Sequence, residues 1–261
     1  MITTREHGPV TQIKMSRFAP GTSVSAYLVD GLLVDSGLAY TAEELAGFLA
    51  SREVHGIVNT HYHEDHIGGN ATVTERCGAK ALAHPLALEK MARRPHLFPY
   101  QEESWGYPAP CTAEAIGESV STAHYRFNVV HTPGHSPDHI CLHEPELGWL
   151  FTGDLFISTH PRVARPEEDQ WQIIQSLRKI AVLKPRLLFT APSNVVTEPE
   201  RVLAETIAYL EQLGARIAGL RARGLTAEQT AREIFGEEGP VTAMTQGQFS
   251  AANLVRGFGG G

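Results

Sequence analysis

The sequence lacks the features that would place the protein in a membrane or in an oxidising compartment. It has no run of about 18 or more apolar residues, so no transmembrane helix is expected. The N-terminal residues 1–7 contain no apolar core of a signal peptide. The three cysteines, Cys77, Cys111 and Cys141, lie far apart without CxxC spacing, which indicates reduced thiols. These absences predict a cytoplasmic protein that does not bind membranes.

Positive charge is also scarce. The 261 residues include 22 Lys and Arg against 29 Asp and Glu, a net charge of −7. A nucleic-acid partner is therefore not expected, because a phosphate backbone requires a basic surface. With 42% hydrophobic residues, the chain can form a large core, as one domain with an appendage.

Histidine, by contrast, is concentrated in one short segment. Residues 61–66 read His61-Tyr62-His63-Glu64-Asp65-His66, after the apolar run 56–58 and before the pair Gly68-Gly69. Alternate side chains of an extended segment point to the same side, so His61 and His63 can face one point, and Asp65 and His66 a neighbouring one. Imidazole and carboxylate are zinc ligands, and the layout suits two metal ions. The alternative is a solvated loop that is merely rich in histidine.

Two downstream segments each add one such residue. His135 follows the apolar run 127–130 in Thr-Pro-Gly-His, and Asp154 follows another in Phe-Thr-Gly-Asp. Gly134 and Gly153 allow a sharp turn beside an ion. HxHxDH followed by this His and this Asp resembles the metallo-β-lactamase-fold superfamily over roughly residues 10–200.

The resemblance implies an α/β fold, a four-layer αββα sandwich, and a metal centre. One ion would be bound by His61, His63 and His135, the other by Asp65 and His66, with Asp154 bridging both. A water or hydroxide between the ions would be the nucleophile. Asp65 would be the catalytic residue that orients this water and then protonates the leaving group.

One histidine that the family usually supplies is missing. It would come from a short loop after a late strand, here residues 191–194 after the strand 186–190, yet no histidine follows His160. His160 is the nearest candidate for an extra ligand, and a surface histidine is the alternative. We therefore expect one tightly bound Zn²⁺ and a second, weaker one, with Fe²⁺ or Mn²⁺ as alternative ions.

Other residues are candidates for supporting roles. Asp35, at the end of a predicted strand, resembles the family's aspartate that supports the metal loop, or is a simple turn residue. His84 is either a supporting residue or a plain strand-end histidine. Trp105 and Tyr107 lie in the proline-rich segment 85–125, which predicts no long regular element. We interpret residues 95–110 as pocket wall, with a loop pinned to the core as the alternative.

Sequence patterns also predict individual elements. Strands are expected at 24–29 and 32–35, joined by an Asp30-Gly31 turn, and at 57–59, 79–83 and 127–130. A helix is expected over 41–51, with Thr41 as N-cap and Glu44 completing a capping box. Further helices are expected at 199–213, 226–235 and 249–258. We therefore divide the chain into a catalytic domain, 1–197, and a C-terminal helical module, 198–261, that covers the active site or forms a homodimer.

The predicted function is metal-dependent hydrolysis of an activated acyl bond in a small molecule, such as a thioester, lactone or β-lactam. The fold alone does not choose among these. The missing histidine favours an alternative, a sulfur dioxygenase acting on a low-molecular-weight persulfide through one iron held by His61, His135 and Asp154. A degenerate metal-binding scaffold is the third hypothesis.

Overall fold

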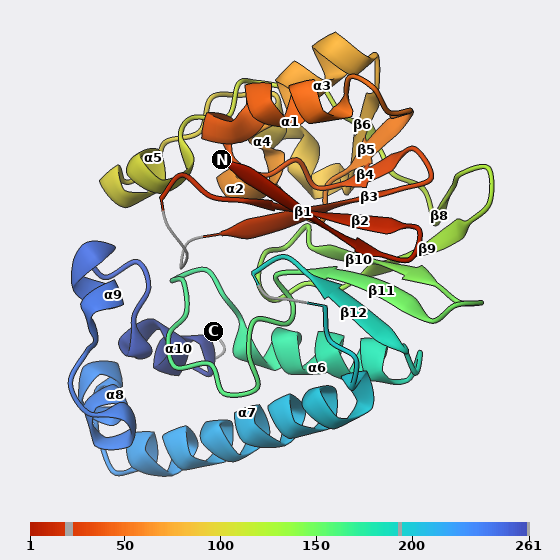
Figure 1. The fold of residues 1–261 in the computed structure, drawn as a ribbon. Helices are drawn as coiled ribbons and strands as arrows, with labels where there is room; N and C mark the ends of the chain where they lie inside the picture. Colours follow the sequence, from red (N-terminus) through yellow and green to blue (C-terminus); the bar gives the residue numbers. More distant parts are fainter. Residues whose placement is uncertain (19–22, 193–194, 260–261) are drawn as a thin grey trace.

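Two facing β-sheets with helices on both outer sides make up the molecule (Figure 1). The computed structural model describes residues 1–18, 23–192 and 195–259. Among these residues, the first sheet has seven strands, in spatial order β1 Ile2–His7, β2 Val10–Met15, β3 Val24–Val29, β4 Leu32–Val34, β5 Gly56–Val58, β6 Lys80–Ala83 and β7 Glu114–Ala115. The second has five, in spatial order β12 Leu187–Thr190, β11 Trp149–Gly153, β10 Ile140–Glu144, β9 Arg126–His131 and β8 Ser119–Ser121.

The helices and short 3₁₀ turns follow in chain order. Their bounds are η1 Ala39–Thr41, α1 Ala42–Leu49, α2 Glu64–Ile67, α3 Asn70–Cys77, η2 Pro85–Ala87, α4 Leu88–Met91, α5 Pro99–Trp105, α6 Gln170–Ala181, α7 Pro199–Ala222, α8 Ala227–Phe235, α9 Pro240–Met244 and α10 Ala251–Gly257. Within the described residues, no helix is both long and apolar enough to cross a membrane.

The inner faces of the two sheets pack on each other through aromatic side chains. Phe151 of β11 and Phe189 of β12 stack with ring centroids 4.7 Å apart, and Tyr27 of β3 packs edge-on against Phe151 at 5.5 Å. All residues of β3 and β10 are buried, because both strands lie inside this sandwich. Such aromatic pairs add to the free energy of burial and fix how the sheets face each other.

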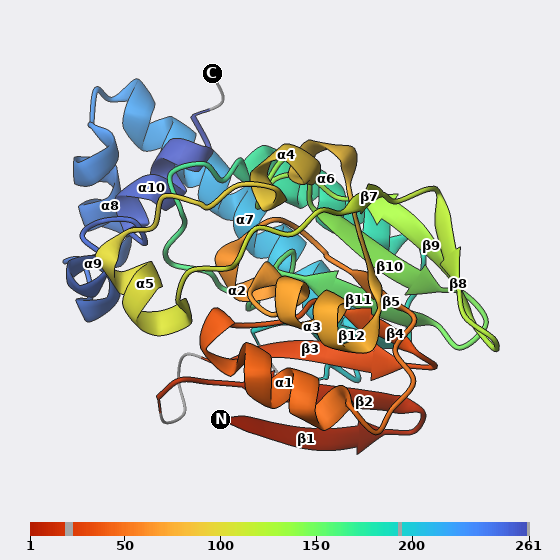
Figure 2. The ribbon, with the colours of Figure 1, turned by 90° about the horizontal axis from the view of Figure 1, so that it is seen from above.

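Helices cover both outer faces, and the predicted four-layer αββα sandwich is confirmed. Figure 2, seen from above, shows α1 and α3 over the strands of the first sheet. Leu45 and Leu49 of α1 share an apolar cluster with Leu33 and Ile57 of that sheet. On the other side, α6, α7, α8 and α10 form one apolar cluster with the outer face of the second sheet.

Several predicted elements are confirmed. Asp30 and Gly31 both have positive φ, 47° and 79°, as expected of the tight turn between β3 and β4. The capping box that opens α8 at Thr226 is present. Segment 85–125 contains only short elements, and α5 begins at Pro99, where a proline costs no hydrogen bond.

Other details differ from the sequence prediction. The Thr41 side chain does not cap α1, because Thr41 also ends the preceding 3₁₀ turn and its hydroxyl donates to Leu38 O. Glu44 instead accepts from the Ile2 amide at 3.0 Å, which ties α1 to the edge strand β1. α7 extends to Ala222, beyond the predicted end at residue 213. β1, β2, β10 and α6 were not predicted.

Candidate metal centre

His61 and His63 lie in the loop that leaves the buried strand β5. His63 is the extended residue at the N-terminus of α2, so this loop turns sharply after it. The turn depends on Gly68, whose Cα lies against the η1 segment: an added Cβ would be 2.2 Å from Ala39 N. The Asn59 side chain donates to His66 O at 3.1 Å and holds the start and end of the loop together.

The other two segments arrive from the second sheet. His135 follows β9 and Gly134, where φ is 135° and an added Cβ would lie 2.5 Å from Ile173 N in α6. Asp154 follows β11 and Gly153, where an added Cβ would lie 2.6 Å from Thr60 Oγ1. Both glycines therefore permit a backbone approach that no other residue would allow.

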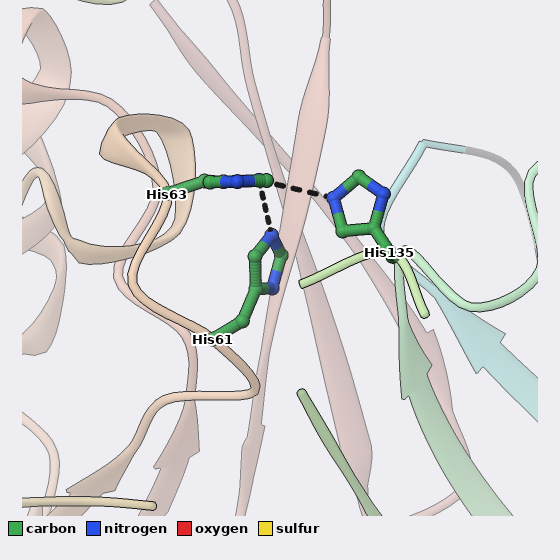
Figure 3. Close-up of side chains that lie close together, drawn as sticks. All are labelled: His61, His63 and His135. Atoms are coloured by element: carbon green, nitrogen blue, oxygen red, sulfur yellow. Dashed lines mark hydrogen bonds between the residues drawn. The ribbon is translucent and has the colours of Figure 1, made fainter. Parts of the chain in front are cut away.

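Three histidines converge at one point (Figure 3). His61 Nε2 lies 2.9 Å from His63 Nδ1, and His135 Nε2 lies 3.0 Å from the same atom. All three side chains are buried. Figure 3 shows the two histidines of the first loop and the one from the second sheet directed at the same space.

A second group adjoins the first and shares His61 with it. It consists of His61, His66 and Asp154. Asp154 lies between the two groups: Oδ1 is 3.4 Å from His66 Nε2, and Oδ2 is 3.6 Å from His135 Nε2. Asp65 Oδ2 is 3.8 Å from His66 Nε2.

The geometry fits metal ions. A hydrogen on His63 Nδ1 can serve only one of its two neighbouring ring nitrogens, whereas an ion among three nitrogens satisfies all of them. Zn–N bonds of about 2.0–2.1 Å in a tetrahedral site imply nitrogens about 3.3 Å apart, near the observed spacing. His66 Nε2 and Asp65 Oδ1 are buried without a hydrogen-bond partner among the described residues, as unfilled ligand atoms would be.

The buried carboxylate of Asp35 orients the His66 ring. Its Oδ2 lies 2.8 Å from His66 Nδ1, and its Oδ1 accepts from the Thr60 amide at 2.8 Å. The Thr60 hydroxyl, which donates to Asp35, is also 3.0 Å from His61 Nδ1. The carboxylate thus leaves Nε2 of His66 directed at Asp154.

Three residues that the sequence analysis did not identify complete the surroundings. They lie in the loop between Asp154 and α6. Glu168 Oε1 is 3.3 Å from His135 Nδ1, and Glu167 Oε1 is 3.7 Å from His63 Nε2. Buried Arg165 lies 3.7 Å from Glu64. In the sequence, the cluster of charged residues at 165–169 after the candidate ligand Asp154 was the signal that could have identified these three residues.

Burial and neighbouring charges shift the protonation of these groups. Burial, reinforced by neighbouring imidazoles, lowers the pKa of His61 well below its ordinary value. Burial also lowers the pKa of His66, but the carboxylates of Asp35, Asp154 and Asp65 outweigh it and raise that pKa well above normal. Burial raises the pKa of Asp65 to about 6. Burial lowers the pKa of His139, next to His61, to about 3.

Several candidates from the sequence lie apart from these groups. His84 stacks on His131 with centroids 4.4 Å apart. His160 packs against Tyr209 and lies 3.6 Å from Glu205. Trp105 packs on Tyr100 and under Arg165, and Tyr107 lies beneath Arg94.

The late loop enters beside Asp154. Ala191 N donates to Gly153 O at 3.2 Å, so residue 191 adjoins the residue that precedes Asp154. Pro192 follows, while Ser193 and Asn194 lie outside the described residues.

Two cavities adjoin the histidines. One of about 390 Å³ is lined by His63, Tyr62, Glu64 and the segment around Arg94. The other, about 40 Å³, is narrow and mostly apolar, with His135 and Asp154 at one end and Leu177, Leu210 and Leu254 in its wall.

Comparison with known proteins agrees with the geometry. Residues 19–191 match the family model described as the metallo-beta-lactamase superfamily. The chain is 33% identical over 196 residues to a hydroxyacylglutathione hydrolase of Maricaulis maris, covering 70% of this chain and 69% of that one. It is 30% identical over 178 residues to the beta-lactamase-like protein 2 homolog of Drosophila melanogaster, covering 64% of this chain and only 56% of that protein.

A solved structure shares the whole architecture. A metallo-beta-lactamase family protein of Thermus thermophilus superimposes with a TM-score of 0.68 at 20% identity, over 95% of this chain and 92% of that one. At this identity the likeness supports the fold.

Proposed function

The chain belongs to the metallo-beta-lactamase superfamily, and we propose that it hydrolyses an activated acyl bond, with a thioester as the first candidate. One observation carries the proposal. Asp154 lies between His66 and His135, at 3.4 and 3.6 Å, so its carboxylate can join two adjacent ion sites. Lactones and β-lactams have similarly activated carbonyls and remain further candidates.

His61, His63 and His135 would hold the first ion, and Asp65 and His66 the second, with Asp154 between them. Such ions supply Lewis acidity, which activates water at neutral pH and polarises a carbonyl. We propose Zn²⁺ as the resident ion, one bound tightly and one weakly. The chain itself contributes burial, which lowers the pKa of His61 and His63 well below the ordinary value and leaves these two imidazoles neutral and available as ligands.

Asp65 is the proposed catalytic residue. Its carboxylate lies beside His66, and its buried Oδ1 has no hydrogen-bond partner among the described residues. With one carboxylate oxygen on the ion, the other would accept a proton from water and pass it to a leaving thiolate. Asp35 orients His66 through a 2.8 Å hydrogen bond, and Glu168 and Glu167 place carboxylates 3.3 and 3.7 Å from ring nitrogens of His135 and His63.

The relatives favour thioesters over the other acyl bonds. The Maricaulis maris protein bears the name hydroxyacylglutathione hydrolase. Protein loaded with zinc should be assayed on a thioester, a lactone and a β-lactam of similar size. The expected result is the highest kcat/KM on the thioester, and no turnover of any of the three would contradict the proposal.

A mononuclear iron dioxygenase acting on a persulfide is the second candidate. The chain has no histidine after His160, so the second ion has few protein ligands. Metal analysis of protein purified without added metal separates these functions. About two zinc ions per chain support the hydrolase, one iron supports the dioxygenase, and no metal supports a degenerate scaffold.

We propose a small-molecule substrate, no nucleic-acid partner, a cytoplasmic location and a homodimer formed through the C-terminal helices. Size-exclusion chromatography with light scattering tests the dimer.

A further inference from the structure

A cavity with an excess of basic side chains is lined in part by His63. Its volume is about 390 Å³, and its wall carries Lys90, Arg93, Arg94 and Arg165 against the two carboxylates of Glu64 and Glu167. This local excess of positive charge stands out in a chain with a net charge of −7. Positive charge gathered in a concave wall raises the local concentration of anions.

We propose that this cavity binds a carboxylate or phosphate group carried on the thiol half of a thioester substrate, an assignment that rests on the proposed acyl hydrolysis. Two of its cations have no carboxylate partner among the described residues, namely Lys90 and Arg94. Arg93, by contrast, pairs with Glu89 at 3.0 Å. A bound anion could therefore form ion pairs with Lys90 and Arg94 without breaking an existing one.

Both unpaired cations rest on aromatic rings. Lys90 Nζ lies 3.6 Å from the centroid of the Tyr62 ring, and Arg94 Cζ lies 4.2 Å from that of Tyr107. Cation–π contacts hold the flexible side chains in place, which reduces the entropy lost on binding. Tyr62 and Lys90 line the same cavity as His63, so an anion bound at Lys90 would share that cavity with a candidate metal ligand.

Arg165 is a buried cation in the wall of the cavity. Its side chain is 6% exposed and lies 3.7 Å from Glu64 and 4.0 Å from Glu167. A charge removed from water interacts more strongly than one on the surface.

The narrow cavity lined by His135 and Asp154 supports this orientation of the substrate. Its volume of about 40 Å³ and its Leu177, Leu210 and Leu254 wall suit a small apolar acyl group. The thiol half, which is larger and charged in common carrier thiols, then belongs in the basic cavity.

Kinetics on three thioesters test the assignment. S-acetylglutathione carries carboxylates, acetyl-coenzyme A carries phosphates, and S-acetyl-N-acetylcysteamine is neutral. In the double variant Lys90→Gln/Arg94→Gln we expect KM to rise about tenfold for the preferred charged substrate, equivalent to about 1.4 kcal/mol, with kcat within about twofold. The KM of the neutral thioester should not change.

The matched control is Arg5→Gln/Arg223→Gln, which removes the same charge from residues outside the cavity wall. It should leave all three KM values unchanged. An equal change in KM for charged and neutral substrates, or no change, would overturn the assignment. The charged substrate with the larger effect identifies carboxylate or phosphate as the ligand.

A binding measurement separates this assignment from the proposed function. S-methylglutathione and desulfo-coenzyme A cannot be hydrolysed as thioesters, and their binding to metal-loaded protein can be followed by calorimetry. Suppose that no thioester is turned over, but one probe binds and its affinity falls in the double variant. The cavity assignment then stands and the proposed function fails. If all thioesters are hydrolysed equally well and neither probe binds, the assignment fails and the function stands. Absence of both turnover and binding overturns both.

Discussion

The Tyr62 amide donates a hydrogen bond to Asp138 Oδ2 at 2.8 Å. This bond joins the loop that carries His61 and His63 to the loop that carries His135, across the interface of the two sheets. Asp138 is buried, its Oδ1 accepts from the Ser136 hydroxyl at 2.7 Å, and burial raises the pKa of its carboxyl. One carboxylate therefore fixes how the two histidine loops meet.

Replacing Asp138 by Ala should weaken both the fold and the metal centre. The change removes two buried hydrogen bonds and leaves the Tyr62 amide without its partner, at a cost of about 2–3 kcal/mol. Urea unfolding of metal-free protein measures the stability, and metal content after dialysis measures the centre. Asp138→Asn is the control, since its amide oxygen can still accept from Tyr62 and should restore most of both. Equal metal retention in Asp138→Ala and the parent would contradict this role.

Asp65→Asn should retain the fold and the first ion but lower turnover by about a hundredfold or more. An amide neither accepts a proton from water nor offers a charged ligand to the second ion. Steady-state kinetics and metal analysis, run together, separate the two effects. Unchanged turnover on the best substrate would remove Asp65 from the mechanism and favour the mononuclear iron alternative.

Metal removal should proceed in two steps. His61, His63 and His135 converge on one point, and Asp154 lies 3.6 Å from His135. The proposed second site has only one histidine of its own, His66, beside Asp65 and the shared Asp154. A chelator titration followed by metal analysis should release one equivalent well before the other. Loss of the last equivalent should also lower Tm, because the ion binds only the folded chain. Two equally tight sites would contradict the expected difference.

Restoring the missing histidine should strengthen the second site. Ala191 N bonds to Gly153 O, so the residues after it begin beside Asp154. Pro192→His and Ser193→His each offer an imidazole from this segment, although residue 193 lies outside the described structure. The correct position should retain the second ion through dialysis, with equal or higher hydrolase activity. If neither variant changes the metal content, the segment does not approach the ions.

The sequence revealed the metal-binding motif because its residues are close together and its glycines mark the turns. It also revealed α8, since the Thr226 capping box is a local signal. Glu167 and Glu168 could not be assigned, because their contacts depend on how a loop folds back over His63 and His135. His160 shows the reverse: it is near Asp154 in sequence, but it packs on Tyr209 of α7.

The missed elements have different causes. The sequence contains a local signal for α6, because apolar residues recur at helical spacing, namely Ile173, Ile174, Leu177 and Ile180. β1, in contrast, is an exposed edge strand with no apolar pattern. Its position depends on pairing with β2 and on the contact with Glu44, neither of which a local window contains.

Residues 164 and 250 are paired as a short antiparallel bridge, with Ala164 N donating to Ser250 O at 3.1 Å and Ser250 N donating to Ala164 O at 3.3 Å. The loop that delivers Arg165, Glu167 and Glu168 is thus anchored to the start of α10. We therefore expect substitutions around residue 250 to change catalytic activity, although this residue lies more than 90 positions along the chain from Asp154. For directed evolution, this makes the C-terminal helices a place to tune the active site without touching any metal-binding side chain.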